Sequence, residues 1–180
     1  MSGSKALWIQ TGYELFALHG ESHLKVDHLA RRAGVSKSSF YHYFEDSKWF
    51  LEALCRHHVI RCHELAERER LANSIDPELI TILIEYKTDL LFNRQLRLHP
   101  DDLLFQRTLS EVNHAIGSEM LALWARDINW TRDLDALAGI FEMATQNFYT
   151  QLSPANLNEA WLRAYFSQLR TIARRVDMPG

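Results

Sequence analysis

The sequence has few residues that interrupt regular backbone structure. Glycine occurs seven times and proline four times in 180 residues. Strict alternation of apolar and polar residues, the pattern of a half-buried strand, is not sustained anywhere along the chain. The scarcity of helix breakers and the missing strand pattern together predict an all-α protein. Hydrophobic residues make up 47% of the chain, which is enough for a packed core.

Long hydrophobic runs are missing as well. No run of about eighteen apolar residues occurs, so the sequence predicts no membrane-spanning helix. The first residues also lack the extended apolar segment of a signal peptide. We therefore expect a cytoplasmic protein that does not bind membranes.

Cysteine is scarce, and the two that occur are Cys55 and Cys62. They fall two helical turns apart in a helical pattern, which separates them by about 10 Å. That distance is too long for a disulfide between them. We expect both to be reduced thiols.

Sequence motifs of enzymatic catalysis are absent. The chain contains no glycine-rich phosphate loop, no Gly-x-Ser-x-Gly elbow and no His-Glu-x-x-His pair. Its nine histidines are scattered, and the adjacent His57 and His58 fall on different faces of a helix. The sequence therefore predicts neither an enzyme nor a cofactor.

Positive charge is not in excess, since the formal net charge is −3. The charge is nevertheless uneven, because residues 1–50 carry +1 and the remainder carries −4. This asymmetry has the sign expected of a DNA-binding N-terminal part, but charge alone does not predict one.

The stretch from Leu24 to Lys48 has the pattern of two short helices around a tight corner. Gly34 ends the first helix, because glycine adopts the left-handed backbone of a helix C-terminus at little cost. Ser36 is a suitable N-cap for the second helix, because its hydroxyl can accept a backbone N–H. The buried face of the first helix recurs at three- and four-residue steps and comprises Val26, Leu29, Ala30 and Ala33.

The second helix begins with short or cationic polar residues, from Ser36 to Ser39, and continues into aromatic ones. A helix that enters the major groove must present slim hydrogen-bonding side chains at its N-terminal end and bury its other face. The polar residues meet the first requirement, and Phe40 and Phe44 meet the second. The stretch therefore predicts a helix-turn-helix.

Many residues among the first fifty also match a pattern that is known from one protein family. They are Trp8-Ile9, Glu14-Leu15-Phe16-Ala17, Gly20, Val26, Leu29-Ala30, Ala33-Gly34-Val35-Ser36-Lys37 and Phe40-Tyr41-His42-Tyr43-Phe44. With them, about the first fifty residues resemble the N-terminal domain of TetR-family transcriptional regulators. The resemblance implies a double-stranded DNA operator as partner and a helical regulatory domain that dimerises and often binds a small-molecule effector. Repression is the commoner action in that family, so it also implies a repressor.

We therefore expect two parts, a helix-turn-helix DNA-binding domain of three helices over residues 1–50 and an effector-binding and dimerisation domain over residues 51–180. The apolar patterns predict helices over residues 5–19, 48–71, 77–92, 133–152 and 154–176, besides the helix-turn-helix pair. Between them, residues 93–99 are expected to form a break, and Gly117 is expected to divide the helical region that begins at Pro100.

The last two predicted helices carry wide apolar stripes. Each stripe is broader than one edge of a monomeric domain needs. Two such helix pairs, one from each of two chains, can close a four-helix bundle. We expect this bundle to form a homodimer.

Candidate DNA contacts fall into two groups. Ser36, Lys37, Ser38 and Ser39 are placed to meet base edges, because lysine and serine can bond to them. The remaining candidates, which suit phosphates or flank the helix, are Lys25, Tyr41, His42, Tyr43 and Lys48. In the family, the positions that match Tyr41 and Lys48 commonly contact the DNA backbone, which is what the resemblance implies for them here.

Cys55, His58 and Cys62 share one face of the predicted helix over residues 48–71, because their spacing follows steps of three and four. Stacked in this way they could form a metal- or thiol-sensing site that regulates DNA binding. The same face could equally line the core, where cysteine behaves as a small apolar residue. A structural zinc site usually needs four ligands, and only three are present here.

The effector site is expected among soft and aromatic residues of the regulatory part, since ligand sites are mostly apolar with a few polar groups. The candidates are His58, Cys62, Tyr86, Phe105, Trp124, Phe141 and Phe148. Core packing explains each of them equally well. A further alternative is a helical ligand- or protein-binding dimer whose DNA affinity has weakened, which the low charge of residues 1–50 favours.

Overall fold

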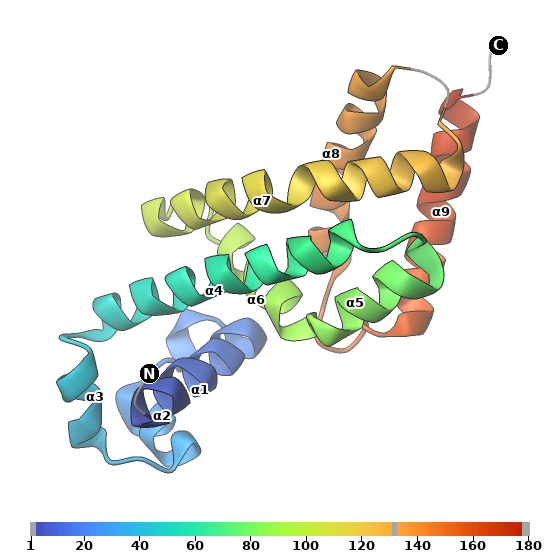
Figure 1. The fold of residues 1–180 in the computed structure, drawn as a ribbon. Helices are drawn as coiled ribbons and strands as arrows, with labels where there is room; N and C mark the ends of the chain where they lie inside the picture. Colours follow the sequence, from blue (N-terminus) through green and yellow to red (C-terminus); the bar gives the residue numbers. More distant parts are fainter. Residues whose placement is uncertain (1–2, 131–132, 178–180) are drawn as a thin grey trace. The chain divides into compact units, whose positions relative to one another are not determined.

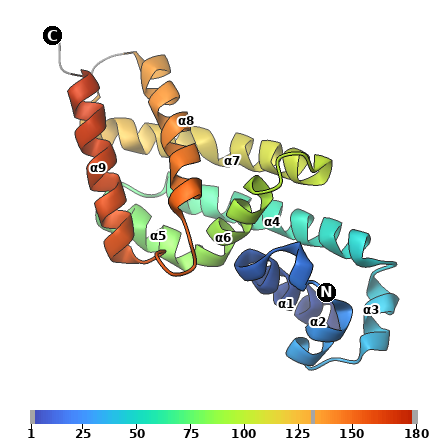
Figure 2. The same cartoon turned by 180° about the vertical axis from the view of Figure 1, so that it is seen from behind.

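The computed structural model describes residues 3–130 and 133–177, and these form helices joined by short loops (Figures 1 and 2). The helices are α1 (Gly3–His19), η1 (Glu21–His23), α2 (Val26–Ala33), α3 (Lys37–Tyr43), α4 (Ser47–Arg70), η2 (Ile75–Leu79), α5 (Ile80–Glu85), α6 (Lys87–Arg97), α7 (Leu103–Ile128), α8 (Leu134–Gln151) and α9 (Glu159–Asp177). No strand occurs in the described ranges. The prediction of an all-α fold is confirmed.

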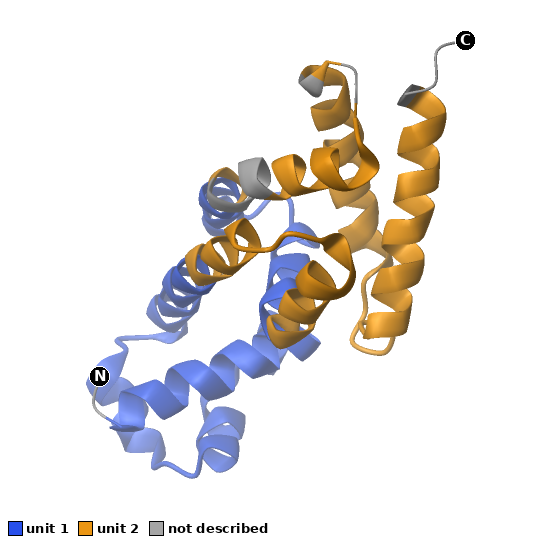
Figure 3. Ribbon diagram, turned by 45° about the vertical axis from the view of Figure 1, so that its right-hand side comes forward, with its two compact units in different colours: residues 1–61, 88–112 blue, residues 62–87, 113–180 orange. Residues whose placement is uncertain are grey.

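The chain forms two compact units (Figure 3). Unit 1 comprises residues 1–61 and 88–112, and unit 2 comprises residues 62–87 and 113–180. The long helices α4 and α7 therefore each contribute to both units. We expected a boundary at residue 50 between a DNA-binding domain and an effector-binding domain. The two compact units do not test where these functions divide, so this boundary stays a prediction.

In unit 1, α1 contacts both α2 and α3, and aromatic rings fill the centre of this part. The ring centroid of Phe40, which is fully buried, lies 5.2 Å from that of Trp8 and 5.3 Å from that of Phe50. Phe44 completes the cluster with its ring 4.8 Å from Phe50. Gly12 of α1 faces Phe50 so closely that no side chain fits between them. The aromatic residues of α3 thus fix this helix on α1 and α4.

A second aromatic cluster in unit 1 joins α1 to α6 and α7. The ring of Phe92 is stacked on Tyr13 at 4.4 Å and lies 4.4 Å from Phe16. Phe105 packs edge-on against Phe16 at 5.7 Å. All four side chains are buried. Because aromatic rings contribute large apolar areas, these contacts hold α1 firmly within unit 1.

In unit 2, α9 contacts both α5 and α8. Phe148 of α8 packs against Trp161 and Tyr165 of α9, with ring centroids 5.4 and 5.3 Å apart. The hydroxyl of Tyr165 donates a hydrogen bond of 2.6 Å to the carbonyl of Ala144. The two last helices therefore form a pair within one chain, as their apolar stripes predicted (Figure 2).

The prediction for residues 77–99 was wrong in its boundaries. We expected one helix to about Phe92 followed by a break, whereas the helix is interrupted at Tyr86 and α6 continues to Arg97. Two of the polar side chains that suggested a break, Asn93 and Arg97, are paired inside the helix. Asn93, which is 3% exposed, accepts a hydrogen bond of 3.0 Å from Arg97 one turn later.

Two further expectations about helix ends were wrong. Gly117 does not divide α7, because a single glycine inside a long helix costs only about 1 kcal/mol. Pro154 does not open the last helix, which begins at Glu159. Asn158 provides the cap instead, since its side-chain oxygen accepts the backbone N–H of Trp161 at 3.0 Å.

Across residues 3–130 and 133–177, no helix combines the length and the apolar character needed to cross a membrane.

Candidate nucleic-acid interface

The corner between α2 and α3 has the predicted backbone. Gly34 has a left-handed conformation with φ 67°, and its N–H bonds to the carbonyl of Ala30. Ser36 occupies the N-cap position of α3, but its hydroxyl makes no cap hydrogen bond and instead lies 3.1 Å from the hydroxyl of Ser38. The position of the cap was therefore predicted correctly, whereas the bond that it was expected to make was not.

The N-terminal end of α3 is exposed. Ser36, Lys37 and Ser38, which we call the recognition tip, are all exposed, whereas Phe40 one turn later is fully buried. A short helix that is anchored by a buried ring and has a polar end in solvent can enter a groove without uncovering the core. The tip can therefore reach base edges.

Ser39 differs from the recognition tip, although the sequence grouped them. Its hydroxyl accepts a hydrogen bond of 3.0 Å from the indole N–H of Trp8 and donates one of 2.7 Å to the carbonyl of Ser36. The side chain is half-buried. Ser39 thus fixes α3 on α1, and its only hydrogen is already used within the protein.

Lys37 forms an ion pair with Asp27 of α2, with 2.9 Å between its Nζ and the carboxylate. The hydrogen bond and the charge of Asp27 raise the pKa of Lys37 above its ordinary value. Lys37 therefore stays protonated, and DNA must compete with Asp27 for it. Asp27 escaped the sequence reasoning, because nothing in the local spacing relates it to a residue of the next helix.

The candidates for phosphate contacts are mostly exposed. Tyr41 is 57% exposed, His42, Lys25 and Lys48 are exposed, and Tyr43 is half-buried. Lys25 occupies the N-cap position of α2 without a side-chain cap bond. Its ammonium group is thus not used at the helix end.

Trp49, at the start of α4, is an exposed residue beside the candidate phosphate contacts that the sequence analysis did not single out. Asp46 caps this helix, because its carboxylate accepts the backbone N–H of Trp49 at 2.8 Å. Trp49 itself is 53% exposed and is adjacent to Lys48. Helical periodicity could have predicted the exposure of Trp49, because the apolar face of α4 runs through Phe50 and Leu54 and leaves Trp49 outside it.

The same part of the chain matches a known family. Residues 9–54 match the model described as bacterial regulatory proteins, tetR family. This N-terminal segment belongs to the TetR family. It is a DNA-binding domain of the kind found in bacterial regulatory proteins.

Solved structures of TetR-type regulators resemble this chain in fold over nearly its whole length. A TerR/AcrR-family transcriptional regulator from Aquifex aeolicus VF5 has a TM-score of 0.64 at 16% identity, over 97% of this chain and 99% of that one. A tetR-family transcriptional regulator from Streptomyces coelicolor has a TM-score of 0.60 at 13% identity, over 99% and 91%. The fatty acid degradation regulator FadR from Bacillus halodurans has 0.57 at 17% identity, over 92% and 97%. None of the curated proteins matches the sequence.

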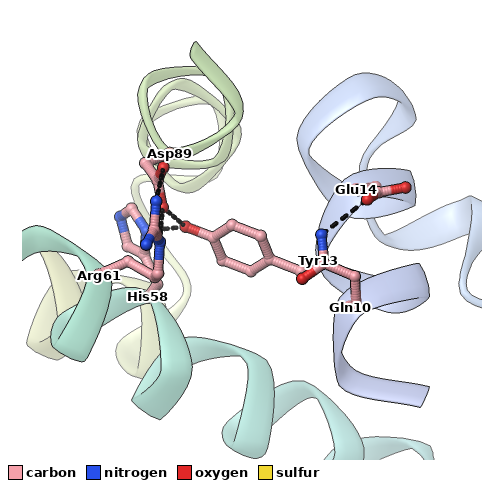
Figure 4. Close-up of polar contacts among 6 residues, drawn as sticks. All are labelled: Gln10, Tyr13, Glu14, His58, Arg61 and Asp89. Atoms are coloured by element: carbon pink, nitrogen blue, oxygen red, sulfur yellow. Dashed lines mark hydrogen bonds and ion pairs between the residues drawn. The ribbon is translucent and has the colours of Figure 1, made fainter. Parts of the chain in front are cut away.

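A buried polar network in unit 1 links α1, α4 and α6 (Figure 4). The hydroxyl of Tyr13 donates to the carboxylate of Asp89 at 2.8 Å and lies 2.7 Å from Nδ1 of His58. Arg61 binds the same carboxylate through Nε at 3.1 Å and Nη2 at 3.2 Å. Because the Tyr13 hydrogen goes to Asp89, His58 must donate through Nδ1. The sequence reasoning did not find this network, whose members lie as many as 76 positions apart.

Cys55, His58 and Cys62 are all buried. Burial raises the pKa of the Cys55 thiol to about 11 and lowers that of His58 to about 3. A thiol of this kind is almost never the reactive thiolate near neutral pH. Within the part of the chain that the structure describes, no three His, Cys, Asp or Glu residues are grouped to hold a metal ion. Burial thus disfavours a reactive thiolate at Cys55, and the metal- or thiol-sensing alternative stays a prediction.

The candidates for the effector site are divided between the two units. His58 and Phe105 lie in unit 1, where they pack against Phe92 and Phe16. The candidates in unit 2 are Cys62, Tyr86, Trp124, Phe141 and Phe148. Of these, the rings of Trp124 and Phe141 come together with centroids 6.0 Å apart. Their role in ligand binding stays a prediction.

Proposed function

We propose that this protein is a homodimeric repressor that binds a specific DNA operator and is released from it by a small-molecule effector. The observation that carries the proposal is the exposed recognition tip on a helix anchored by the buried Phe40. A groove-binding helix needs this combination. Such a regulator acts in the cytoplasm, where its operator is.

Within the interface we assign two roles. The recognition tip reads base edges, with Lys37 exchanging the carboxylate of Asp27 for guanine acceptors. Tyr41, Lys25 and Lys48 position the domain on phosphates, which carry no sequence information directly. Trp49 extends this positioning surface beside Lys48, because its exposed ring can pack against the sugar-phosphate backbone.

Two lysine substitutions test this division of roles. Lys48→Ala should weaken binding to every duplex and reduce the slope of log affinity against log salt by about one. Lys37→Ala should relax the preference at one base pair, where a lost contact costs about 1–3 kcal/mol. Both effects are measurable by fluorescence anisotropy on a selected operator and its single-base variants at several salt concentrations.

Arg107→Ala is the matched control for these lysines, because it removes one exposed positive charge from α7, outside the recognition helix and the proposed dimer helices. It should leave both affinity and salt slope unchanged. If the two lysine variants act identically on all operator variants, the division into reading and positioning residues is wrong. If the wild-type protein shows no salt-dependent binding to any duplex, the alternative of a dimer with lost DNA affinity replaces the repressor.

The homodimer is proposed to form through α8 and α9. Both helices expose apolar side chains that a soluble monomer would bury, with Met143 68% exposed, Ile172 45% and Val176 43%. A second copy would cover these side chains in a four-helix bundle. Two recognition helices about 34 Å apart would then meet successive major grooves of a near-palindromic operator.

Met143→Glu should convert the dimer to a monomer, because a charge would be buried in the proposed bundle. Sedimentation velocity measures the oligomeric state. Operator binding should weaken in parallel, since one monomer contacts only one half-site. Leu103→Glu is the control, because this equally exposed leucine lies outside α8 and α9. A dimer that survives Met143→Glu would contradict the proposed interface.

A ligand releases such a dimer only if it binds one conformation more tightly than the other. We propose that the effector favours a state in which the two recognition helices no longer fit successive grooves. Effector binding would then weaken DNA binding, and DNA binding would weaken effector binding by the same factor.

A further inference from the structure

Glu69, near the end of α4 in unit 2, is a buried acid with no partner in the part of the chain that the structure describes. Its side chain is 2% exposed, and neither carboxylate oxygen has a hydrogen-bond partner among the described residues. The adjacent arginines do not compensate it, because Arg68 pairs with Glu85 at 2.8 Å and Arg70 with Glu67 at 2.7 Å. An interior carboxyl group is thus left unsatisfied.

Such a position is unfavourable for the folded protein by itself. Burial raises the pKa of Glu69 to about 8, because no nearby group stabilises the charge. Buried polar groups in native proteins are nearly always hydrogen-bonded, so an exception needs a reason. A binding site supplies one, since an anchor must keep its bonding capacity for the ligand.

Trp124, on the part of α7 in unit 2, is a second unsatisfied group. Its side chain is 3% exposed, and its indole N–H has no partner among the described residues. The ends of the two helices meet, because Arg126 donates to the carbonyl of Ala72 at 3.4 Å. Phe141 adds a second aromatic ring 6.0 Å from that of Trp124. An acceptor at Glu69 and a donor at Trp124 therefore each lie within three residues of this contact between the helix ends, and Phe141 adds aromatic surface beside Trp124.

We propose that Glu69 and Trp124 are the polar anchors of the effector site and that the effector is a small aromatic or apolar amine in its protonated form. The ammonium group donates hydrogen bonds to Glu69, and the indole N–H of Trp124 donates to an acceptor atom elsewhere on the ligand. This inference rests on the proposed function, because it assigns the chemistry of the effector.

The charge of the anchor decides the class of ligand. An anion would be repelled by an ionised Glu69. A protonated amine supplies both the positive charge and the hydrogen-bond donors that the carboxylate lacks, so its binding favours the ionised form over the protonated form that burial favours. The aromatic faces of Trp124 and Phe141 add a cation–π or stacking surface for the rest of the molecule.

The probes are three amines of increasing size, tyramine, 4-methoxyphenethylamine and 5-methoxytryptamine, each of which carries a ring oxygen that can accept from Trp124, and each is compared with its alcohol and carboxylate counterparts. Isothermal titration calorimetry measures their binding to the full-length protein without DNA. At least one amine should bind about tenfold or more tightly than its alcohol, because a hydrogen bond to a charged group contributes that much. If no amine is preferred over its counterparts, the proposal is overturned.

Glu69→Gln should abolish the preference for the amine while leaving the alcohol's affinity unchanged. It keeps the size of the side chain and removes a buried charge, so it should fold. Glu67→Gln is the matched control, because it removes an exposed carboxylate two residues away. Trp124→Phe, which removes only the N–H donor and part of the ring, should weaken amine binding without changing the preference for a cation. Equal amine affinity in wild type and Glu69→Gln would contradict the assignment.

DNA binding separates this inference from the proposed function. In the wild type the preferred amine should weaken operator binding, and in Glu69→Gln it should not. An amine that binds through Glu69 but leaves operator affinity unchanged would exclude this site as the effector site. Absence of operator binding without any ligand would instead refute the repressor, whatever the amines do.

Discussion

Gly12→Ala is expected to lower the free energy of unfolding by about 3 kcal/mol, because it overpacks an aromatic core. A Cβ atom at Gly12 would lie 2.3 Å from Cζ and 2.8 Å from Cε1 of Phe50. The Phe50 ring is 1% exposed and is held by Phe40 and Phe44, so it cannot move aside. The collision separates α1 from α4 within unit 1 and should also disturb α3.

Urea denaturation followed by circular dichroism measures this change. Gly139→Ala is the matched control, because this glycine lies in α8 with no atom within 4 Å of the added Cβ. The control should gain up to about 1 kcal/mol from the higher helix propensity of alanine. The combination of Gly12→Ala with Phe50→Leu should recover part of the loss. A Gly12→Ala protein as stable as the control would show that the close approach is not essential.

Asp89→Ala is expected to lower the free energy of unfolding by about 3 kcal/mol, since removal of one partner leaves a buried ionic network incomplete. Asp89 is 3% exposed, accepts from Tyr13 and is bound by two nitrogens of Arg61. Without the carboxylate, the arginine loses its counter-charge and the tyrosine its acceptor. Because Arg61 is 32% exposed, water relieves part of this cost.

Denaturation of a double-mutant cycle tests the origin of this loss. Tyr13→Phe removes only the hydroxyl and should cost about 1–2 kcal/mol. Asp89→Asn keeps the shape and an acceptor and should cost less than Asp89→Ala. The combined Tyr13→Phe and Asp89→Asn variant should destabilise less than the sum of the two, because the residues share one bond. Additive effects would mean that the two side chains contribute independently.

The helix-turn-helix was predictable because its signals are local. Val26, Leu29 and Ala30 mark a helix face, and Gly34 marks its end within a few residues of sequence. Of the aromatic residues that follow the recognition tip, Phe40 was expected to be buried, and it is. Helical periodicity likewise predicted α1, α4, α8 and α9, whereas the ends of α6 and α9 depended on side-chain bonds at Asn93 and Asn158.

Periodicity also contained a signal that was not used. The apolar face of α4 passes through Cys55, His58, Cys62 and Leu65, and a further step of four reaches Glu69. An acid on this face would have been expected to be buried. The charged residues on either side of Glu69 obscure this pattern, because a run of charged residues at a helix end usually indicates an exposed surface.

The sequence by itself determined the all-α class, the helix-turn-helix corner and the polar tip of α3, since each depends on neighbouring residues and helical repeat. Only the tertiary structure decided which polar groups are paired. It placed Asp27 against Lys37, Trp8 against Ser39 and Tyr13 against Asp89, and among residues 3–130 and 133–177 it gave Glu69 no hydrogen-bond partner. The physical reason is that such pairs join separate helices, and their meeting depends on how the helices pack rather than on spacing along the chain.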